Sequence, residues 1–369
     1  MNHDQFLQQG RYAGLDLAGL DPQVVWDLYR HMLRLRRCEE ALVREYRVAQ
    51  EIRCPVHFTL GQEAVPASLA LLLQPRDFLF SHHRCHGYFL AKHAPMQSLF
   101  AELFGRATGA NGGLAGSQEI SMPSHNFHSG AILSGALAIA AGAALGFQLR
   151  GQPEISLAGF GEAATEEGIF WEAISYAAVR KLPLIYVCEN NIYSMYSHMA
   201  MRQPPIPLHE RVASFGVKTR AVFGNDVAAV HRVMCEAVAQ TRQGNGPWFL
   251  EFFTYRWNAH VGPESDDGFG YRPAEELEYW KSNCPIALLE EKMTAAGWPV
   301  LARRQEFLQD TDREIAAALA FARSSPFPEG GDLAALNRNP RSPVAERMLP
   351  ESTFGEFDQN QAPARLAPY

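Results

Sequence analysis

An alternation of apolar runs and a helical segment between residues 155 and 189 constrains this chain more than any other feature. Strands are predicted at residues 155–161 and 184–189, and the segment between them, residues 165–181, has the pattern of a helix. Two strands joined by a helix normally lie parallel in one sheet, and another apolar strand is predicted at residues 248–254. The sequence therefore predicts an α/β fold, with a central, mostly parallel sheet and helices on both faces.

The composition is typical of a soluble globular protein and excludes several function classes. Of 369 residues, 47% are hydrophobic and 20% charged, and 33 basic against 40 acidic side chains give a net charge of −7. No long basic run offers a surface for nucleic acid, so no nucleic-acid partner is expected. The six cysteines are scattered without metal-site or disulfide spacing, and the first ten residues lack a signal pattern. We therefore expect a cytoplasmic protein.

The coarse organisation is an N-terminal arm at residues 1–23, one domain at residues 24–323 and a proline-rich tail at residues 324–369, which is either loosely ordered or laid on a partner. The charge-free run at residues 130–147 is mostly alanine and glycine, which contribute little transfer energy, so it predicts a buried helix and no membrane span. A glycine-rich stretch at residues 105–116 predicts a loop whose backbone closely approaches another group. Other helices are predicted at residues 24–50, at residues 61–73, and from Trp298 to about Arg323.

The candidate site lies where the first strand of this alternation turns into its helix, in LAGFGEAATEEG (157–168). Free backbone N–H groups and the positive end of a helix favour a diphosphate there, although an ordinary turn has the same local pattern. The next strand ends in ENNIY (189–193), so uncharged oxygen ligands are expected at the carboxyl end of a neighbouring strand. One carboxylate, one amide oxygen and one backbone carbonyl, completed by diphosphate oxygens and water, suit Mg²⁺.

Several separate stretches resemble the alpha subunits of thiamine-diphosphate-dependent 2-oxo acid dehydrogenases, which include the pyruvate, branched-chain and acetoin enzymes. The resemblance covers roughly residues 24–310, and EYWKSNCPI (278–286) leans toward the branched-chain members. It rests on LYRHMLRLRRCEEAL (28–42), HFTLGQEAV (57–65), FGRATGANGGLAGS (104–117), WEAISYAAVRKLPLIYVCENN (171–191) and TYRWNAHVGPESDD (254–267). The fold implied is the diphosphate-binding half of the thiamine-diphosphate-binding fold.

The family signature is glycine, acid, glycine, four residues and glycine, with Asn-Asn about thirty residues later. A frame that begins at Gly159 puts Phe160 at the acid position, and phenylalanine cannot bind a metal. A frame that begins at Gly161 places Glu162 at the acid position and Gly168 at the last glycine, with Glu162 lying 29 residues before Asn191.

The resemblance then implies thiamine diphosphate and Mg²⁺ as cofactors. The implied metal ligands are Glu162, Asn191 and the backbone carbonyl of Tyr193. The implied cofactor-binding residues are His83, Arg84, Ile132, Ser134, Gly161, Glu162, Ala163, Ala164, Asn191, Tyr193 and His260. His86 and His260 match active-site histidines, whereas a zinc site made by His82, His83, Cys85 and His86 is not expected, because these side chains diverge in a short segment.

Some positions depart from the family pattern. Ala163 replaces the second signature glycine, and a Cβ there costs about 1 kcal/mol if the position needs a positive φ. Glu119 and Ser175 stand where many relatives have histidine and asparagine, and Val261 stands where mitochondrial relatives have a phosphorylated serine. These departures suggest a divergent bacterial member.

The resemblance implies a subunit that decarboxylates a small 2-oxo acid and passes the acyl unit to a lipoyl acyltransferase or another carrier protein. The active site would be completed by a beta subunit in an α2β2 heterotetramer, because the family's ring-activating glutamate lies on that chain. Two alternatives stay open. One is a biosynthetic enzyme that transfers a two-carbon or acyl unit to a carrier protein or a carbonyl; the other is a non-catalytic subunit with weakened cofactor binding.

Overall fold

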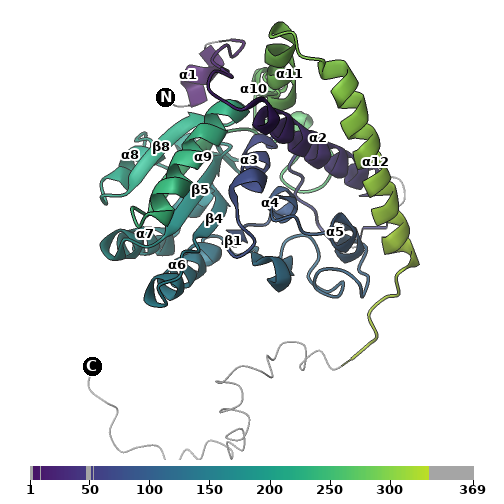
Figure 1. The fold of residues 1–369 in the computed structure, drawn as a ribbon, viewed down its shortest axis with the longest axis horizontal. Helices are drawn as coiled ribbons and strands as arrows, with labels where there is room; N and C mark the ends of the chain where they lie inside the picture. The colour runs from purple at the N-terminus through teal and green to yellow at the C-terminus, as the bar shows by residue number, and fades with distance from the viewer. Residues whose placement is uncertain (1–2, 9, 47–50, 53, 332–369) are drawn as a thin grey trace, which may run out of the picture. The chain divides into compact units, whose positions relative to one another are not determined.

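A sheet of seven strands, parallel except at one edge, forms the centre of the part of the chain that the computed structural model describes (Figure 1). This part comprises residues 3–8, 10–46, 51–52 and 54–331. The strand order is β2-β3-β1-β4-β5-β9-β8, and only the β2–β3 pair is antiparallel. The strands are β1 Phe78–Ser81, β2 Ser121–Met122, β3 Phe127–Ser129, β4 Ser156–Gly161, β5 Leu184–Asn190, β8 Lys218–Phe223 and β9 Trp248–Phe253, with a separate hairpin of β6 Tyr193–Ser194 and β7 Ser197–His198. The predicted fold class is therefore confirmed.

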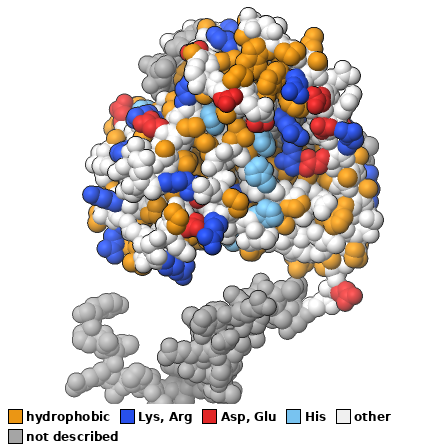
Figure 2. All heavy atoms as spheres, viewed as in Figure 1, with side chains coloured by type: hydrophobic (Ala, Val, Ile, Leu, Met, Phe, Trp, Pro, Cys, Tyr) orange, Lys and Arg blue, Asp and Glu red, His pale blue; other side chains and the backbone are white. Residues whose placement is uncertain are grey.

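Helices cover both faces of this sheet (Figure 1). On the face of the molecule drawn in Figure 2, charged side chains of both signs lie among hydrophobic ones. The α-helices are α1 His3–Gln8, α2 Pro22–Arg44, α3 Ala64–Leu72, α4 His86–Ala91, α5 Met96–Leu103, α6 Gly135–Leu149, α7 Gly168–Arg180, α8 Leu208–Ala213, α9 Val227–Arg242, α10 Ala274–Ser282, α11 Pro285–Ala295 and α12 Val300–Ser324. Short 3-10 helices include η2 Pro123–His125, η3 Glu162–Glu166, η4 Met199–Met201 and η5 Asp267–Phe269.

The central strands are buried on both sides, which explains their continuous apolar pattern. Along β4, Leu157 packs in the core shared with α9, whereas Ala158 packs in the core shared with α6 and α7. Neighbouring β5 alternates in the same way, with Val187 in the first core and Tyr186 in the second. This alternation follows from the two-residue period of a strand. The parallel pairing of β4 and β5 places their carboxyl ends at the same edge of the sheet.

The predicted helices exist, but several of their bounds differ from the prediction. The first predicted helix, residues 24–50, is α2 and ends at Arg44, while residues 47–50 lie outside the described residues. The signature segment forms η3 before α7 starts at Gly168, so that helix begins three residues later than predicted. The tail beyond residue 331, within the second unit Glu329–Tyr369, also lies outside the described residues.

The prediction of a buried helix at residues 130–147 was only partly right. Helix α6 packs Ala140 and Ala144 against the sheet, but Ile139 is 61% exposed and Leu149 is 75% exposed. A helix on the outer layer of a sheet buries one stripe only, so the opposite stripe faces outward in a single chain. None of the helices among the described residues is long and apolar enough to cross a membrane.

The glycine-rich loop at residues 105–116 wraps around a carboxylate. Glu102, at the end of α5, accepts hydrogen bonds from the backbone N–H groups of Asn111, Gly113, Ala115 and Gly116 at 2.7–3.2 Å. Gly113 has φ +77°, and a Cβ there would lie 2.5 Å from the backbone of Gly105. The group that this backbone approaches is therefore a side chain of the same chain.

Candidate active site

The carboxyl ends of β1, β4 and β5 open into a cavity of about 520 Å³, where ligands of parallel sheets usually bind. Every residue that the resemblance implied as cofactor-binding lines this cavity. These residues are His83, Arg84, Ile132, Ser134, Gly161, Glu162, Ala163, Ala164, Asn191, Tyr193 and His260. They come from segments up to 177 positions apart, since His83 and His260 face the same space. The fold therefore brings the whole predicted set together.

Glu162, Asn191 and Tyr193 form one side of the cavity, which we call the carboxylate wall. Gly161 pairs with Glu189 in the parallel register of β4 and β5, so Glu162 and Asn191 follow the ends of adjacent strands. The Asn191 side-chain oxygen accepts a hydrogen bond from the Tyr193 N–H at 3.2 Å, which orients the segment after β5. A carboxylate, an amide oxygen and a backbone carbonyl are thus available as hard oxygen ligands.

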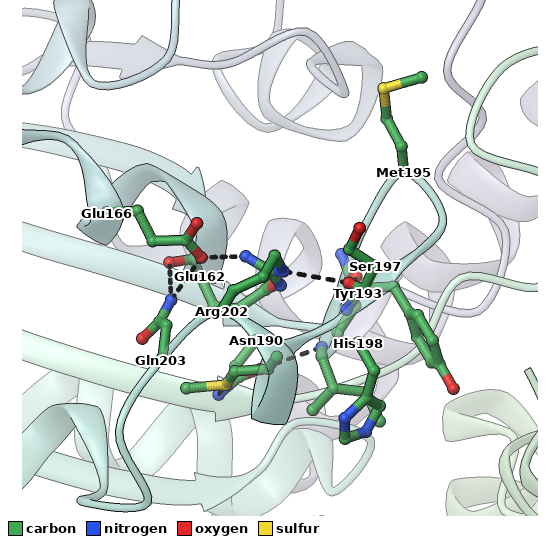
Figure 3. A network of polar contacts seen from close by, with 12 residues as sticks. Glu162, Glu166, Asn190, Tyr193, Met195, Ser197, His198, Arg202 and Gln203 are labelled. Carbon is green, nitrogen blue, oxygen red and sulfur yellow. Dashed lines mark hydrogen bonds and ion pairs between the residues drawn. The ribbon is translucent and has the colours of Figure 1, made fainter. Parts of the chain in front are cut away.

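Arg202 contacts the central acid of this wall (Figure 3). Its Nη2 lies 2.9 Å from Glu162 Oε1, and the Glu162 side chain is only 1% exposed. Burial raises the pKa of the Glu162 carboxyl, and the charge of Arg202 offsets part of that rise. The acid therefore already has one cationic partner within the chain.

A second part of the cavity lining, which we call the imidazole wall, consists of His57, His83, Arg84 and His260. The centroid of the His57 ring lies 4.4 Å from that of the His83 ring and 4.8 Å from that of the His260 ring. Burial, followed by the charge of Arg84, lowers the pKa of His57 to about 2, and the same two causes lower that of His260 to about 3. Burial, together with His82, also lowers the pKa of His83 far below its ordinary value. All three imidazoles are therefore neutral at pH 7.

Arg84 is the cation of the imidazole wall. The residue is 3% exposed, and its guanidinium donates hydrogen bonds to the carbonyl oxygens of Phe58 and, at 3.5 Å, His260. Within the described part of the chain, no carboxylate lies within ion-pair distance of it. Burial, with Arg256 as the next cause, lowers the pKa of Arg84 to about 10. A buried guanidinium without an anionic partner is costly, so this position favours an anionic ligand.

Four residues of the cavity lining also carry a buried polar atom without a hydrogen-bond partner. These atoms are His57 Nδ1, Ser81 Oγ, His82 Nε2 and Glu189 Oε1. Such atoms are normally satisfied in folded proteins. The donor set on the imidazole wall fits a polyanion such as a diphosphate, and the oxygen ligands of the carboxylate wall fit Mg²⁺. The residues present thus match both groups that the resemblance implied.

His86 does not belong to this cavity, although it was predicted to be catalytic. Its side chain is fully buried, with Nδ1 2.7 Å from Glu39 Oε1 and Nε2 2.8 Å from Ser117 Oγ. His86 opens α4 and faces α2, so the turn after His83 carries the ring away from the cavity. Both ring nitrogens are thus engaged inside the protein, and the catalytic role of His86 stays a prediction. Cys85 is likewise turned inward, and its thiol donates a hydrogen bond to the Ser117 carbonyl.

Ala163 lies in η3 and is not among the residues with positive φ, so a Cβ causes no backbone strain there. In contrast, Gly159 packs against the Tyr88 ring, which a Cβ would meet at 2.5 Å. The glycine that packing requires therefore precedes the signature, and the alanine inside the signature is tolerated by the backbone.

Sequence reasoning missed several residues of the cavity and its surroundings. His57 lies in a quoted family stretch, HFTLGQEAV, and that stretch could have suggested it. Glu189 begins the quoted ENNIY run and accepts a hydrogen bond from the Tyr88 hydroxyl at 2.7 Å. Arg202 lies 40 positions from the acid that it contacts, and no spacing rule indicated it.

The chain is similar to known proteins over most of its length. A family model described as "Dehydrogenase E1 component" matches residues 30–330. The chain is similar to the pyruvate dehydrogenase E1 component subunit alpha of Rhizobium meliloti, with 33% identity over 87% of this chain and 92% of the relative. The same subunit of Zymomonas mobilis is 34% identical, over 90% of this chain and 92% of the relative. The human somatic, mitochondrial form is 32% identical, over 81% of this chain and 76% of the relative.

A solved structure of transketolase from Campylobacter jejuni has a related fold. It superposes with a TM-score of 0.50 and 16% identity, over 92% of this chain. The chain spans about half, 51%, of that transketolase chain. This likeness concerns the fold alone.

Proposed function

This chain belongs to the dehydrogenase E1 component family, as an alpha subunit of the thiamine-diphosphate-dependent 2-oxo acid dehydrogenase type, and on that premise we propose that it binds thiamine diphosphate with Mg²⁺ and decarboxylates a 2-oxo acid. The observation that carries the proposal is that one cavity is lined both by Arg84, which has no carboxylate partner among the described residues, and by the oxygen-bearing residues of the carboxylate wall. One wall suits a diphosphate and the other suits the metal that would accompany it.

The residues that line the cavity would have different roles in binding and catalysis. Arg84 and the neutral imidazoles of His57 and His83 would donate hydrogen bonds to the diphosphate, while the carboxylate wall would hold Mg²⁺. Thiamine diphosphate, when bound, supplies a nucleophilic carbon for the carbonyl of the 2-oxo acid and takes up the electrons released with CO₂. His260 would donate a hydrogen bond near the reacting carbonyl, because its ring lines the cavity and is neutral at pH 7.

A beta subunit belongs to the proposal as well. Helices α6 and α7 expose apolar side chains that a single chain leaves in water, which supports a protein partner on this side. The exposed residues are Ile139, Leu149, Ile169, Tyr176 and Val179. We propose an α2β2 assembly, acyl transfer to a lipoyl or other carrier protein, and a cytoplasmic location, in keeping with six free cysteines.

The alternative of a non-catalytic subunit rested on Ala163, and the ordinary φ of that residue removes its main support. The biosynthetic alternative depends on the acyl acceptor, which the cavity of this chain does not specify. No observation therefore favours either alternative over the dehydrogenase subunit.

Calorimetric titration tests the proposal. The chain is co-expressed with its beta partner and titrated with thiamine diphosphate, with and without Mg²⁺. Binding that requires Mg²⁺ is expected, and the absence of any cofactor-dependent heat would refute the enzyme function. A panel of 2-oxo acids, assayed with the same preparation, then identifies the substrate.

A further inference from the structure

The carboxylate wall already contains a cation, and this raises the question of how a metal could enter. Arg202 follows the β6–β7 hairpin and η4, and its guanidinium contacts Glu162, the acid at the metal position of the signature (Figure 3). A divalent ion on this carboxylate would therefore share it with a fixed positive charge.

The position of Arg202 is held by all three guanidinium nitrogens. Nη2 contacts Glu162 Oε1 at 2.9 Å, Nη1 contacts Glu166, and Nε donates to the Ser197 carbonyl at 3.1 Å. Gln203 also stabilises this arrangement, because its Nε2 donates hydrogen bonds to Glu166 Oε1 at 2.9 Å and to the Glu162 backbone carbonyl at 3.2 Å. The Arg202 side chain is only 12% exposed, so water screens its charge weakly.

We propose that Arg202 acts as a counter-ion of Glu162. Its positive charge suppresses metal binding until a diphosphate is present, so the metal and the cofactor bind as a coupled pair. A divalent cation alone would leave Glu162 between two positive groups in a buried place, where their repulsion exceeds thermal energy. A diphosphate adds several negative charges beside the metal and reverses that balance. The coupling is reciprocal: if the diphosphate increases the affinity for the metal by some factor, the metal increases the affinity for the diphosphate by the same factor.

The local structure connects the two events. The segment that carries Arg202 begins with Tyr193, whose carbonyl is a proposed metal ligand, and Tyr193 pairs with His198 across the hairpin. The Met199 N–H donates to the Ile192 carbonyl at 2.7 Å, and the Arg202 N–H donates to the Met199 carbonyl at 2.9 Å. Arg202 and the proposed ligand are thus tied into one short unit. This inference rests on the proposed function, since it concerns the same metal site.

The experiment measures Mn²⁺ binding by the EPR signal of the free ion, because Mn²⁺ takes the same oxygen ligands as Mg²⁺. The full chain with its beta partner is titrated without cofactor and then with saturating thiamine diphosphate. We expect Arg202→Gln to bind Mn²⁺ alone at least about tenfold more tightly than the unaltered protein. Arg202→Lys, which keeps the charge, is expected to stay within about threefold of it.

Arg220→Gln is the matched control, since Arg220 forms an exposed ion pair with Glu236 at 2.8 Å on the edge strand β8. If Arg202→Gln does not fold, Arg202→Met, which fills a similar volume, must give the same gain. Unchanged or weaker Mn²⁺ binding by the charge-removing variant, or no binding of Mn²⁺ alone by any variant, would overturn the inference. A lack of Mn²⁺ binding even with thiamine diphosphate in the unaltered protein would instead refute the proposed function.

Discussion

The two walls of the cavity differ in whether their buried charged side chain has an ionic partner within the chain. On the carboxylate wall, the buried acid Glu162 is already paired with Arg202. On the imidazole wall, the buried cation Arg84 has no carboxylate partner among the described residues, and the neighbouring His57 Nδ1 lacks a hydrogen bond. One wall is electrostatically satisfied before any ligand binds, whereas the other is not. An anion would therefore relieve an existing cost at Arg84, whereas a metal would have to share Glu162 with a cation that is already present.

The largest expected effect comes from removing the acid of the carboxylate wall. Glu162→Gln should weaken binding of thiamine diphosphate with Mg²⁺ by about a hundredfold or more, because the metal would lose the one charged group among its three proposed ligands. Calorimetric titration measures this affinity. Glu166→Gln is the control, since Glu166 also contacts Arg202 but is exposed; it should change the affinity by less than about fivefold. Equal losses in both variants would show that the wall acts only through its total charge.

The second prediction concerns the cation of the imidazole wall. Arg84→Met should weaken cofactor binding by about ten- to a hundredfold, since a charge-assisted contact with the diphosphate is lost. The same change should raise the thermal midpoint of the cofactor-free protein, because a buried charge without an anionic partner is removed. Calorimetry measures both quantities. A lower midpoint together with unchanged affinity would mean that Arg84 serves the fold and not the ligand.

A third prediction separates the walls by their response to pH. The folded-state pKa of His57 is about 2, so below its unfolded value of 6.5 the unfolded chain takes up a proton that the folded chain does not. Stability is therefore lost as the pH falls below 6.5, by about 1–2 kcal/mol from His57 alone at pH 5. His57→Gln should flatten this slope in urea unfolding of the cofactor-free protein between pH 7 and pH 5. An unchanged slope would place the titrating groups elsewhere.

The smallest effect is expected from the departure inside the signature. Ala163→Gly should change cofactor affinity by less than about threefold, because Ala163 has an ordinary φ and needs no glycine. Gly159→Ala is the informative contrast, since its Cβ would strike the Tyr88 ring and should lower the thermal midpoint. A large gain in affinity for Ala163→Gly would show that the alanine Cβ obstructs the cofactor.

Much of the fold was predictable because its signals are local. The apolar runs of β4, β5 and β9 were predicted to within a residue or two, and the glycine-rich loop was recognised by composition. The start of α7 was missed because η3 has helical spacing but tighter turns. The outward stripe of α6 was missed because its exposed positions include the apolar residues Ile139 and Leu149, so no polar face marks it in the sequence.

In the candidate site, too, some features could be predicted from local signals in the sequence and others could not. The proximity of Glu162 and Asn191 was predictable, since parallel neighbours end at one edge of the sheet. The inward turn of His86 was not, because adjacent positions in a turn can point to opposite sides of the backbone. His57 joins His83 and His260 only through the packing of three separate segments.

The fold class could be predicted from the sequence because periodicity along the chain carries that information, and the family and the frame of its signature followed from a resemblance between matched stretches. That Arg202 pairs with Glu162, that buried Arg84 has no carboxylate partner among the described residues, and that His86 is bound to Glu39 became visible in three dimensions. Each of these depends on which distant side chain fills the space next to a group. That is set by packing in three dimensions, and no spacing along the chain encodes it.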